Sequence, residues 1–140
     1  MTIPVAVLIA FAGWTLATLT VAIGWYRWSH ILTGRAAIHE FEGGARQPTG
    51  WSQRAHRAHA NCLENLPLYT AVVVAIVATG AAHPALDPLA LVLIAARVAQ
   101  TSIHIVFDQT ARAVSVRFSF FLVQIACMVA MGTLVVCDGL

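Results

Sequence analysis

The sequence predicts an all-α integral membrane protein, built as one bundle of four transmembrane helices. Hydrophobic residues make up 59% of its 140 residues and charged residues only 10%, whereas a soluble domain has roughly 45–50% and about 25%. Most of the hydrophobic residues fall into four runs, each close to the roughly 20 residues that a helix needs to cross a bilayer. This composition excludes a disordered chain, a nucleic-acid-binding domain and a small secreted domain held by disulfides.

The first two predicted spans flank the longest polar segment of the chain. We predict the first span at about residues 3–25 and the second at about residues 58–82. Both runs are too long for transmembrane strands and lack the alternation of inward and outward residues that such strands show. The segment 29–56 between them is predicted to be a loop with one short helical piece. It contains the helix-breaking residues Gly34, Gly43, Gly44, Pro48 and Gly50.

The other two spans follow after short connections. We predict the third span at about residues 88–107, after a turn rich in glycine and proline, and the fourth at about residues 118–136. Short connections make sequential helices antiparallel neighbours, so residues 1–140 should form a single four-helix domain. The N-terminus has no basic region and its apolar run is too long for a signal peptide, so we expect this run to be a span.

The arginines predict the orientation of the bundle. All eight basic residues are arginine, and seven of them lie in or beside the connections after the first and third spans. The N-terminal residues, the turn at residues 80–87 and the C-terminus have none. Because positively charged connections stay in the cytoplasm, both termini are expected outside it.

The eighth arginine, Arg97, falls near the middle of the third span. An ionisable side chain at that depth is costly and indicates a functional site. Glu64 in the second span has a similar predicted depth, counted at about 1.5 Å per residue, so the two side chains could meet between antiparallel helices. The pair could serve only to hold the helices together, or it could belong to a ligand site.

Further polar residues favour a ligand site. On the second span, Arg57, Asn61 and Glu64 follow helical spacing along one face. The third span has a matching stripe of Arg97, Gln100, Thr101 and His104. Together they predict a polar pocket open to the cytoplasm, suited to an anionic or zwitterionic ligand because arginine binds carboxylates bidentately. Arg112 and Arg117, near the start of the fourth span, are placed to close its mouth.

Three residues of the second span raise the question of a metal. His56, His59 and Cys62 recur every three residues. Three ligands on one helix without a clear fourth are a weak metal signal, so we predict no metal site.

Two motifs resemble those of a known family. Residues 54–69, RAHRAHANCLENLPLY, resemble the second-helix motif of the MAPEG family, the membrane-associated proteins in eicosanoid and glutathione metabolism. Residues 96–104, ARVAQTSIH, resemble its third-helix motif, and the resemblance covers about residues 50–136. It implies a homotrimer of four-helix subunits, with glutathione bound between subunits near the cytoplasmic side. The compact form suggests a bacterial-type member in the inner membrane.

By position, the resemblance also implies roles for single residues. The expected glutathione-binding residues are Arg57, Asn61, Glu64, Arg97 and His104. In catalytic members an arginine near the start of the fourth helix stabilises the thiolate, and here either Arg117 or Arg112 could do so. His104 stands where many members have a tyrosine that touches glutathione, and Ala60 replaces a further arginine of the prostaglandin synthase.

The expected function is thiol chemistry on compounds dissolved in the membrane. A thiol with a pKa near 8.5 ionises more readily beside an arginine, and its thiolate can attack a lipophilic electrophile or reduce it. The expected partners are therefore membrane lipid, a lipophilic small molecule and further copies of the chain, and not nucleic acid. The alternative is a non-catalytic binding or scaffold protein of the same fold. A transporter is disfavoured because the spans show no broken helix and no inverted repeat.

Overall fold

The computed structural model describes residues 1–44 and 50–138, and every regular element in these ranges is helical. Four helical stretches are long and apolar enough to cross a membrane. This confirms the all-α prediction with four spans. The elements are α1 (Ile3–Leu19), the π-helical η1 (Thr20–Trp25), α2 (Tyr26–Leu32), the 3-10 helix η2 (Ile38–Gly44), α3 (Gly50–Thr79), α4 (Leu86–Val106) and α5 (Ala111–Asp138).

Several helices extend beyond the predicted spans. The first stretch continues through η1 and α2 and ends at Leu32 instead of near residue 25. Helix α3 begins at Gly50 instead of near residue 58, and α5 begins at Ala111 instead of near residue 118. Hydropathy marks only the part of a helix that lies in lipid, whereas residues such as alanine, glutamine and arginine continue the helix into the interface. The loop predicted at residues 29–56 is therefore largely helical where it is described.

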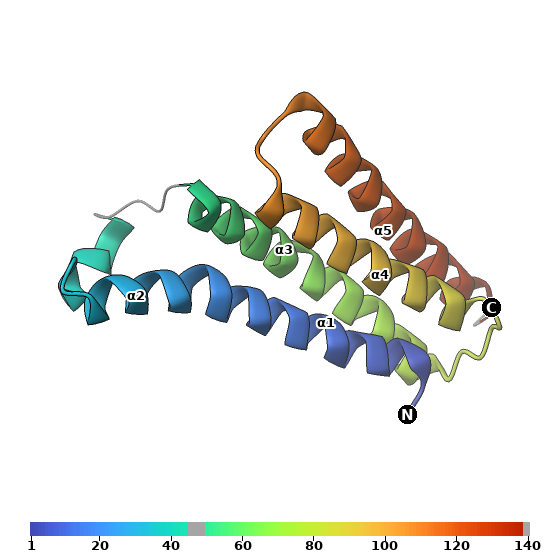
Figure 1. Cartoon of the computed structure of the whole chain (residues 1–140). Helices are drawn as coiled ribbons and strands as arrows, with labels where there is room; N and C mark the ends of the chain where they lie inside the picture. Colours follow the sequence, from blue (N-terminus) through green and yellow to red (C-terminus); the bar gives the residue numbers. More distant parts are fainter. Residues whose placement is uncertain (45–49, 139–140) are drawn as a thin grey trace.

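The long helices form an antiparallel bundle (Figure 1). Helix α1 packs against α3 and α4, and α5 packs mainly against α4 and also against α3. The start of α1 and the end of α5 lie at one end of the bundle, together with the turn between α3 and α4. The connection between α4 and α5 lies at the opposite end, and we call this the connection end.

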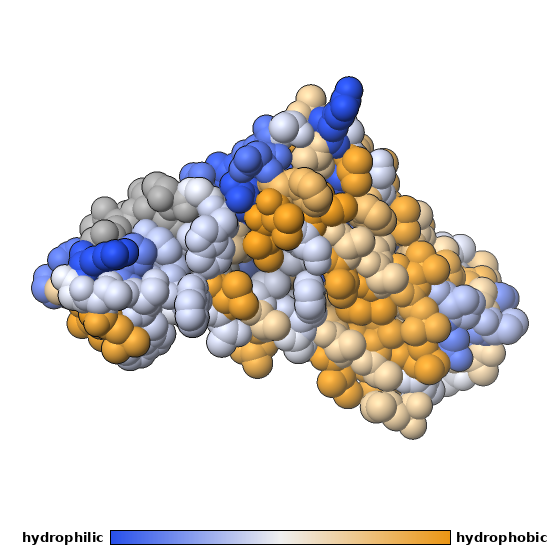
Figure 2. Space-filling view, in the orientation of Figure 1, coloured by the Kyte–Doolittle hydropathy of each residue, from blue (hydrophilic) through white to orange (hydrophobic). Residues whose placement is uncertain are grey.

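The core is drawn from all four long helices. It includes Phe11 of α1, Tyr69 of α3, Leu93 of α4 and Met131 of α5. The hydroxyl of Tyr69 donates a hydrogen bond to the carbonyl of Pro4 at 3.1 Å, which ties the start of α1 to α3. Figure 2 shows apolar side chains over much of the visible surface and hydrophilic residues gathered toward its two ends. This distribution suits a protein whose middle is surrounded by lipid.

Candidate functional site

A small pocket lies between α3, α4 and α5, toward the connection end. Its volume is about 260 Å³. It is lined by Asn61, Gln100, His104, Val114, Arg117, Phe118 and Phe121. Three predicted site residues therefore meet here, one from each helix: Asn61, His104 and Arg117. The wall combines a cation, amides and an imidazole with two aromatic rings, and it can receive a ligand that is polar at one end.

Arg117 is the main cation of this pocket. Its side chain is only 9% exposed. Within residues 1–44 and 50–138, it has no hydrogen-bond or ion-pair partner. His104 lies within electrostatic range of Arg117, and its Nδ1 is buried without a hydrogen-bond partner in the same ranges. Arg117 therefore lines the pocket without a counterion in the described residues.

Arg97 lies behind the pocket wall and is fully buried. Its Nη1 donates a hydrogen bond to Oδ1 of Asn61 at 2.6 Å, and its Cζ lies 5.1 Å from the centroid of the Phe11 ring. Its Nε and Nη2 are buried without hydrogen-bond partners among the residues described. Arg97 thus holds Asn61, the member of the α3 stripe that reaches the pocket.

The predicted contact between Glu64 and Arg97 does not form in the described structure, so this prediction is wrong. Glu64 is exposed on the surface of α3, and no ion pair joins the two residues where the chain is described. The prediction matched only the depths of the side chains. Rotation about the α3 axis decides which residue faces α4, and it brings Asn61 there. Glu64 acts on Arg97 only as a more distant charge.

Arg57 also lies outside the pocket, on the exposed side of α3. Its Nη1 donates a hydrogen bond to Oε1 of Gln109 at 2.9 Å, which links α3 to the connection between α4 and α5. Of the predicted polar stripe of α3, Asn61 therefore lines the pocket, whereas the two charged members, Arg57 and Glu64, are exposed and do not line it.

Arg112 and Arg117 belong to different cavities. Five residues along α5 correspond to a rotation of about 140° around the helix axis. Arg112 accordingly lines a separate groove of about 530 Å³, together with Ile103, Phe107 and Val116. Of the two arginines that the sequence left as alternatives, the structure brings Arg117 to Asn61 and His104.

A scan against protein-family models matches the MAPEG family over residues 4–137. The chain belongs to the MAPEG family. The match covers nearly the whole chain and includes both motifs that carried the resemblance. Together with the four apolar helices, it makes the chain a multi-pass membrane protein. Searches of curated proteins and of solved structures found no match.

A buried polar residue that contacts the pocket wall of this MAPEG protein was not predicted from the sequence. Gln124 of α5 is 1% exposed, and its Nε2 donates hydrogen bonds to Oε1 of Gln100 at 2.9 Å and to the carbonyl of Phe120 at 2.8 Å. It orients Gln100 at the pocket wall. An amide inside an apolar run was the available signal, because such residues commonly bond across membrane helices.

A second missed feature holds the connection end of the MAPEG bundle in place. Nη1 of Arg54 lies 2.6 Å from Oδ1 of Asp108, and its Nε donates to the carbonyl of Ile105 at 3.0 Å. Arg54 thereby ties α3 to the end of α4. These bonds and the Arg57 contact join α3 to the connection that precedes α5.

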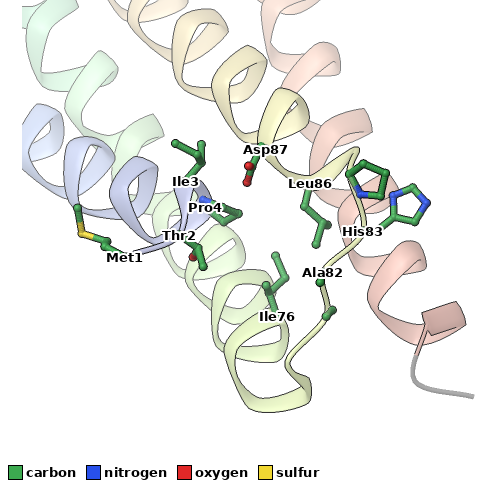
Figure 3. Close-up of a pocket in the computed structure, with 11 residues that line it drawn as sticks. Met1, Thr2, Ile3, Pro4, Ile76, Ala82, His83, Leu86 and Asp87 are labelled. Carbon is green, nitrogen blue, oxygen red and sulfur yellow. The ribbon is translucent and has the colours of Figure 1, made fainter.

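Another cavity lies at the opposite end of the MAPEG bundle (Figure 3). It has a volume of about 370 Å³ and is formed by the start of α1, the end of α3 and the start of α4. None of the predicted site residues lines it, and its ionisable side chains are His83 and Asp87. Across the part of the chain that is described, no three metal-binding side chains come together.

Proposed function

We propose that this MAPEG-family protein binds glutathione, or a thiol of similar charge, in the pocket between α3, α4 and α5. The thiol would conjugate or reduce lipophilic electrophiles from the bilayer. Arg117 carries the proposal, since it is a buried cation on the pocket wall without an acidic partner in the described residues. A counterion strongly stabilises a buried charge. The thiolate of ionised glutathione can be that counterion, while other residues hold its two carboxylates.

The chemistry proposed for the pocket is nucleophilic substitution. Arg117 stabilises the thiolate that forms when the thiol loses its proton to solvent. With an aryl halide, the sulfur forms a bond to the ring carbon and halide leaves with the electron pair of the broken bond. The protein contributes position and electrostatic stabilisation of the anion. Phe118 and Phe121 provide an apolar surface beside the reacting sulfur.

We also propose that three copies assemble, as the family resemblance implies. Glu64 is exposed near the middle of α3, inside a membrane-spanning stretch. A charged side chain facing lipid at the centre of a helix costs about 2.5–3.5 kcal/mol on insertion scales, so another protein surface is the favoured cover. The pocket of one subunit, about 260 Å³, is also slightly below the range of about 300–1,000 Å³ for ligand pockets. A neighbouring copy would enlarge it and add its own exposed Arg57 and Glu64 to the ligand site.

Glutathione binding is directly testable by calorimetric titration of the purified protein in detergent. We expect saturable binding, and we expect the Glu64→Gln variant to bind about tenfold more weakly, since a charge-assisted hydrogen bond to the ligand ammonium is worth about 1.5–3 kcal/mol. S-methylglutathione keeps the carboxylates and the ammonium, so its affinity should fall by the same factor in the Glu64→Gln variant. Equal affinity of the wild type and the Glu64→Gln variant would show that Glu64 does not bind the ligand. Failure of the wild type to bind any thiol would overturn the proposal.

The second candidate is a non-catalytic binding protein of the same fold. His104, in place of the tyrosine found in many family members, favours it, since the imidazole changes the hydrogen bonding available to the ligand. An assay with an aryl halide and a lipid hydroperoxide separates the two candidates. Turnover of either compound supports the enzyme, and glutathione binding without turnover supports the binding protein.

We propose that the connection end faces the cytoplasm and that both termini lie outside it. Six of the arginines, at positions 27, 35, 54, 57, 112 and 117, lie in α2, in the segment after it or toward the connection end, as the positive-inside rule requires. Arg46 lies outside the described residues. A phosphatase fused to the C-terminus should be active, because this reporter folds only outside the cytoplasm, and the same reporter inserted after Gly34 should be inactive. A reporter that fluoresces only in the cytoplasm should show the reverse. The opposite activities of both reporters would show that the termini lie in the cytoplasm.

A further inference from the structure

The groove that contains Arg112 is open and amphipathic. It lies at the corner between α4 and α5 and has a volume of about 530 Å³. Its lining residues are Ile103, Phe107, Asp108, Thr110, Arg112, Ala113 and Val116. Phe107 is 57% exposed, and Val116 and Arg112 are exposed as well. The groove therefore faces the surroundings of the subunit.

The polar and apolar parts of the groove follow the expected order of a membrane interface. The apolar run of the third predicted span ends near residue 107, so we place Phe107 and Thr110 at the membrane boundary. Ile103 lies about one turn inside on α4, and Val116 lies deeper along α5 than Arg112. The cation is thus at the level of lipid headgroups, and the aliphatic side chains are at the level of acyl chains.

The groove carries an uncompensated positive charge. Arg112 has no hydrogen-bond or ion-pair partner within residues 1–44 and 50–138. Asp108, the acidic lining residue, is already paired with Arg54 at 2.6 Å. Oγ1 of Thr110 accepts a hydrogen bond from the backbone N–H of Ala113 at 3.2 Å, so its hydroxyl hydrogen remains available to a ligand. An anion that reaches this position meets a guanidinium and a hydroxyl donor.

We propose that this groove binds an anionic phospholipid. Arg112 and Thr110 bind the phosphate, and one acyl chain lies along Ile103, Phe107 and Val116. Arginine matches the phosphate group because its guanidinium can donate two parallel hydrogen bonds. The site is separate from the proposed thiol site, because Arg112 and Arg117 point into different cavities of the subunit. Arg112 accordingly anchors the start of α5 to the lipid headgroup layer.

Native mass spectrometry of the full chain in detergent tests the headgroup contact. The probes are phosphatidylglycerol and phosphatidylcholine with identical acyl chains, added at increasing concentrations. We expect the wild type to prefer phosphatidylglycerol, and the Arg112→Gln variant to bind it about fivefold more weakly, which corresponds to about 1 kcal/mol for a basic residue near an anionic membrane surface. Arg27→Gln is the matched control, since Arg27 is exposed and lies outside the groove. It should change neither affinity.

Two further measurements test the acyl-chain contact. The Ala113→Phe variant should fill the groove and lower the binding of both lipids while the oligomeric mass stays unchanged. Excess glycerol 3-phosphate, a headgroup without chains, should not displace phosphatidylglycerol from the wild type. Equal weakening by Arg112→Gln and Arg27→Gln would overturn the proposal in favour of diffuse charge attraction. Displacement by glycerol 3-phosphate would show a soluble-phosphate site, and a changed oligomeric mass would show that a second copy covers the groove.

Discussion

Replacing Asn61 with leucine is expected to destabilise the protein by about 3–5 kcal/mol, the cost of removing one partner of a buried charge. Arg97 is fully buried, and its Nη1 donates a hydrogen bond to Asn61 at 2.6 Å. Leucine at position 61 removes the amide oxygen and leaves the guanidinium beside the Phe11 ring and the Cys62 thiol. The free energy of unfolding, measured by denaturant titration in mixed micelles, reports the loss.

The double variant Asn61→Leu with Arg97→Leu separates this effect from simple loss of packing. It removes the buried charge together with its partner, so we expect it to recover most of the stability that the single variant loses. Glu64→Gln should unfold close to the wild type, because no ion pair between Glu64 and Arg97 forms in the described structure. A Glu64→Gln variant as unstable as Asn61→Leu would contradict the assignment of Asn61 as the partner of Arg97.

Replacing Arg117 with leucine is expected to lower turnover of an aryl halide by about 100-fold or more, the usual effect of removing one electrostatic donor from a reacting anion. Glutathione affinity should change little, because we expect other residues to hold the carboxylates. The ultraviolet absorbance of bound thiolate should fall, since the leucine no longer favours ionisation of the thiol. Turnover, affinity and absorbance together distinguish loss of anion stabilisation from loss of binding.

Arg112→Leu is the matched control for this substitution. It removes an arginine from the same helix, but from the separate groove on the corner between α4 and α5. Its effect on turnover and thiolate absorbance should be much smaller. The opposite ranking would transfer the proposed role to Arg112. Unchanged thiolate absorbance in both variants would mean that the arginines only reach toward lipid phosphate and satisfy the positive-inside rule.

The sequence by itself determined the fold class, the number of spans and the family. These properties depend on quantities that run along the chain. A bilayer requires about 20 apolar residues for each helix. The motifs around Asn61 and Arg97 are contiguous, so they are visible without a structure. An arginine inside an apolar run is predicted to be buried within the protein, because a charged side chain must avoid lipid. The structure shows Arg97 fully buried.

The ends of the helices needed the structure. Residues 50–57 and 111–117 are polar enough to leave an apolar span, yet both segments are helical. A hydropathy pattern reports where the surrounding lipid ends. Backbone hydrogen bonding decides where the helix ends, and it continues wherever the residues allow it.

The contacts within the site were decided only by the tertiary structure. Spacing along the chain gives the depth of Glu64 and Arg97, but packing sets the rotation of α3, and that rotation turns Asn61 to Arg97 and Glu64 to the surface. Rotation of α5 likewise separates Arg117 from Arg112 and brings Gln124 to Gln100. The physical reason is that the bilayer constrains each helix only along its normal. The angle around each helix axis is set by side chains of neighbouring helices that lie far apart in the sequence.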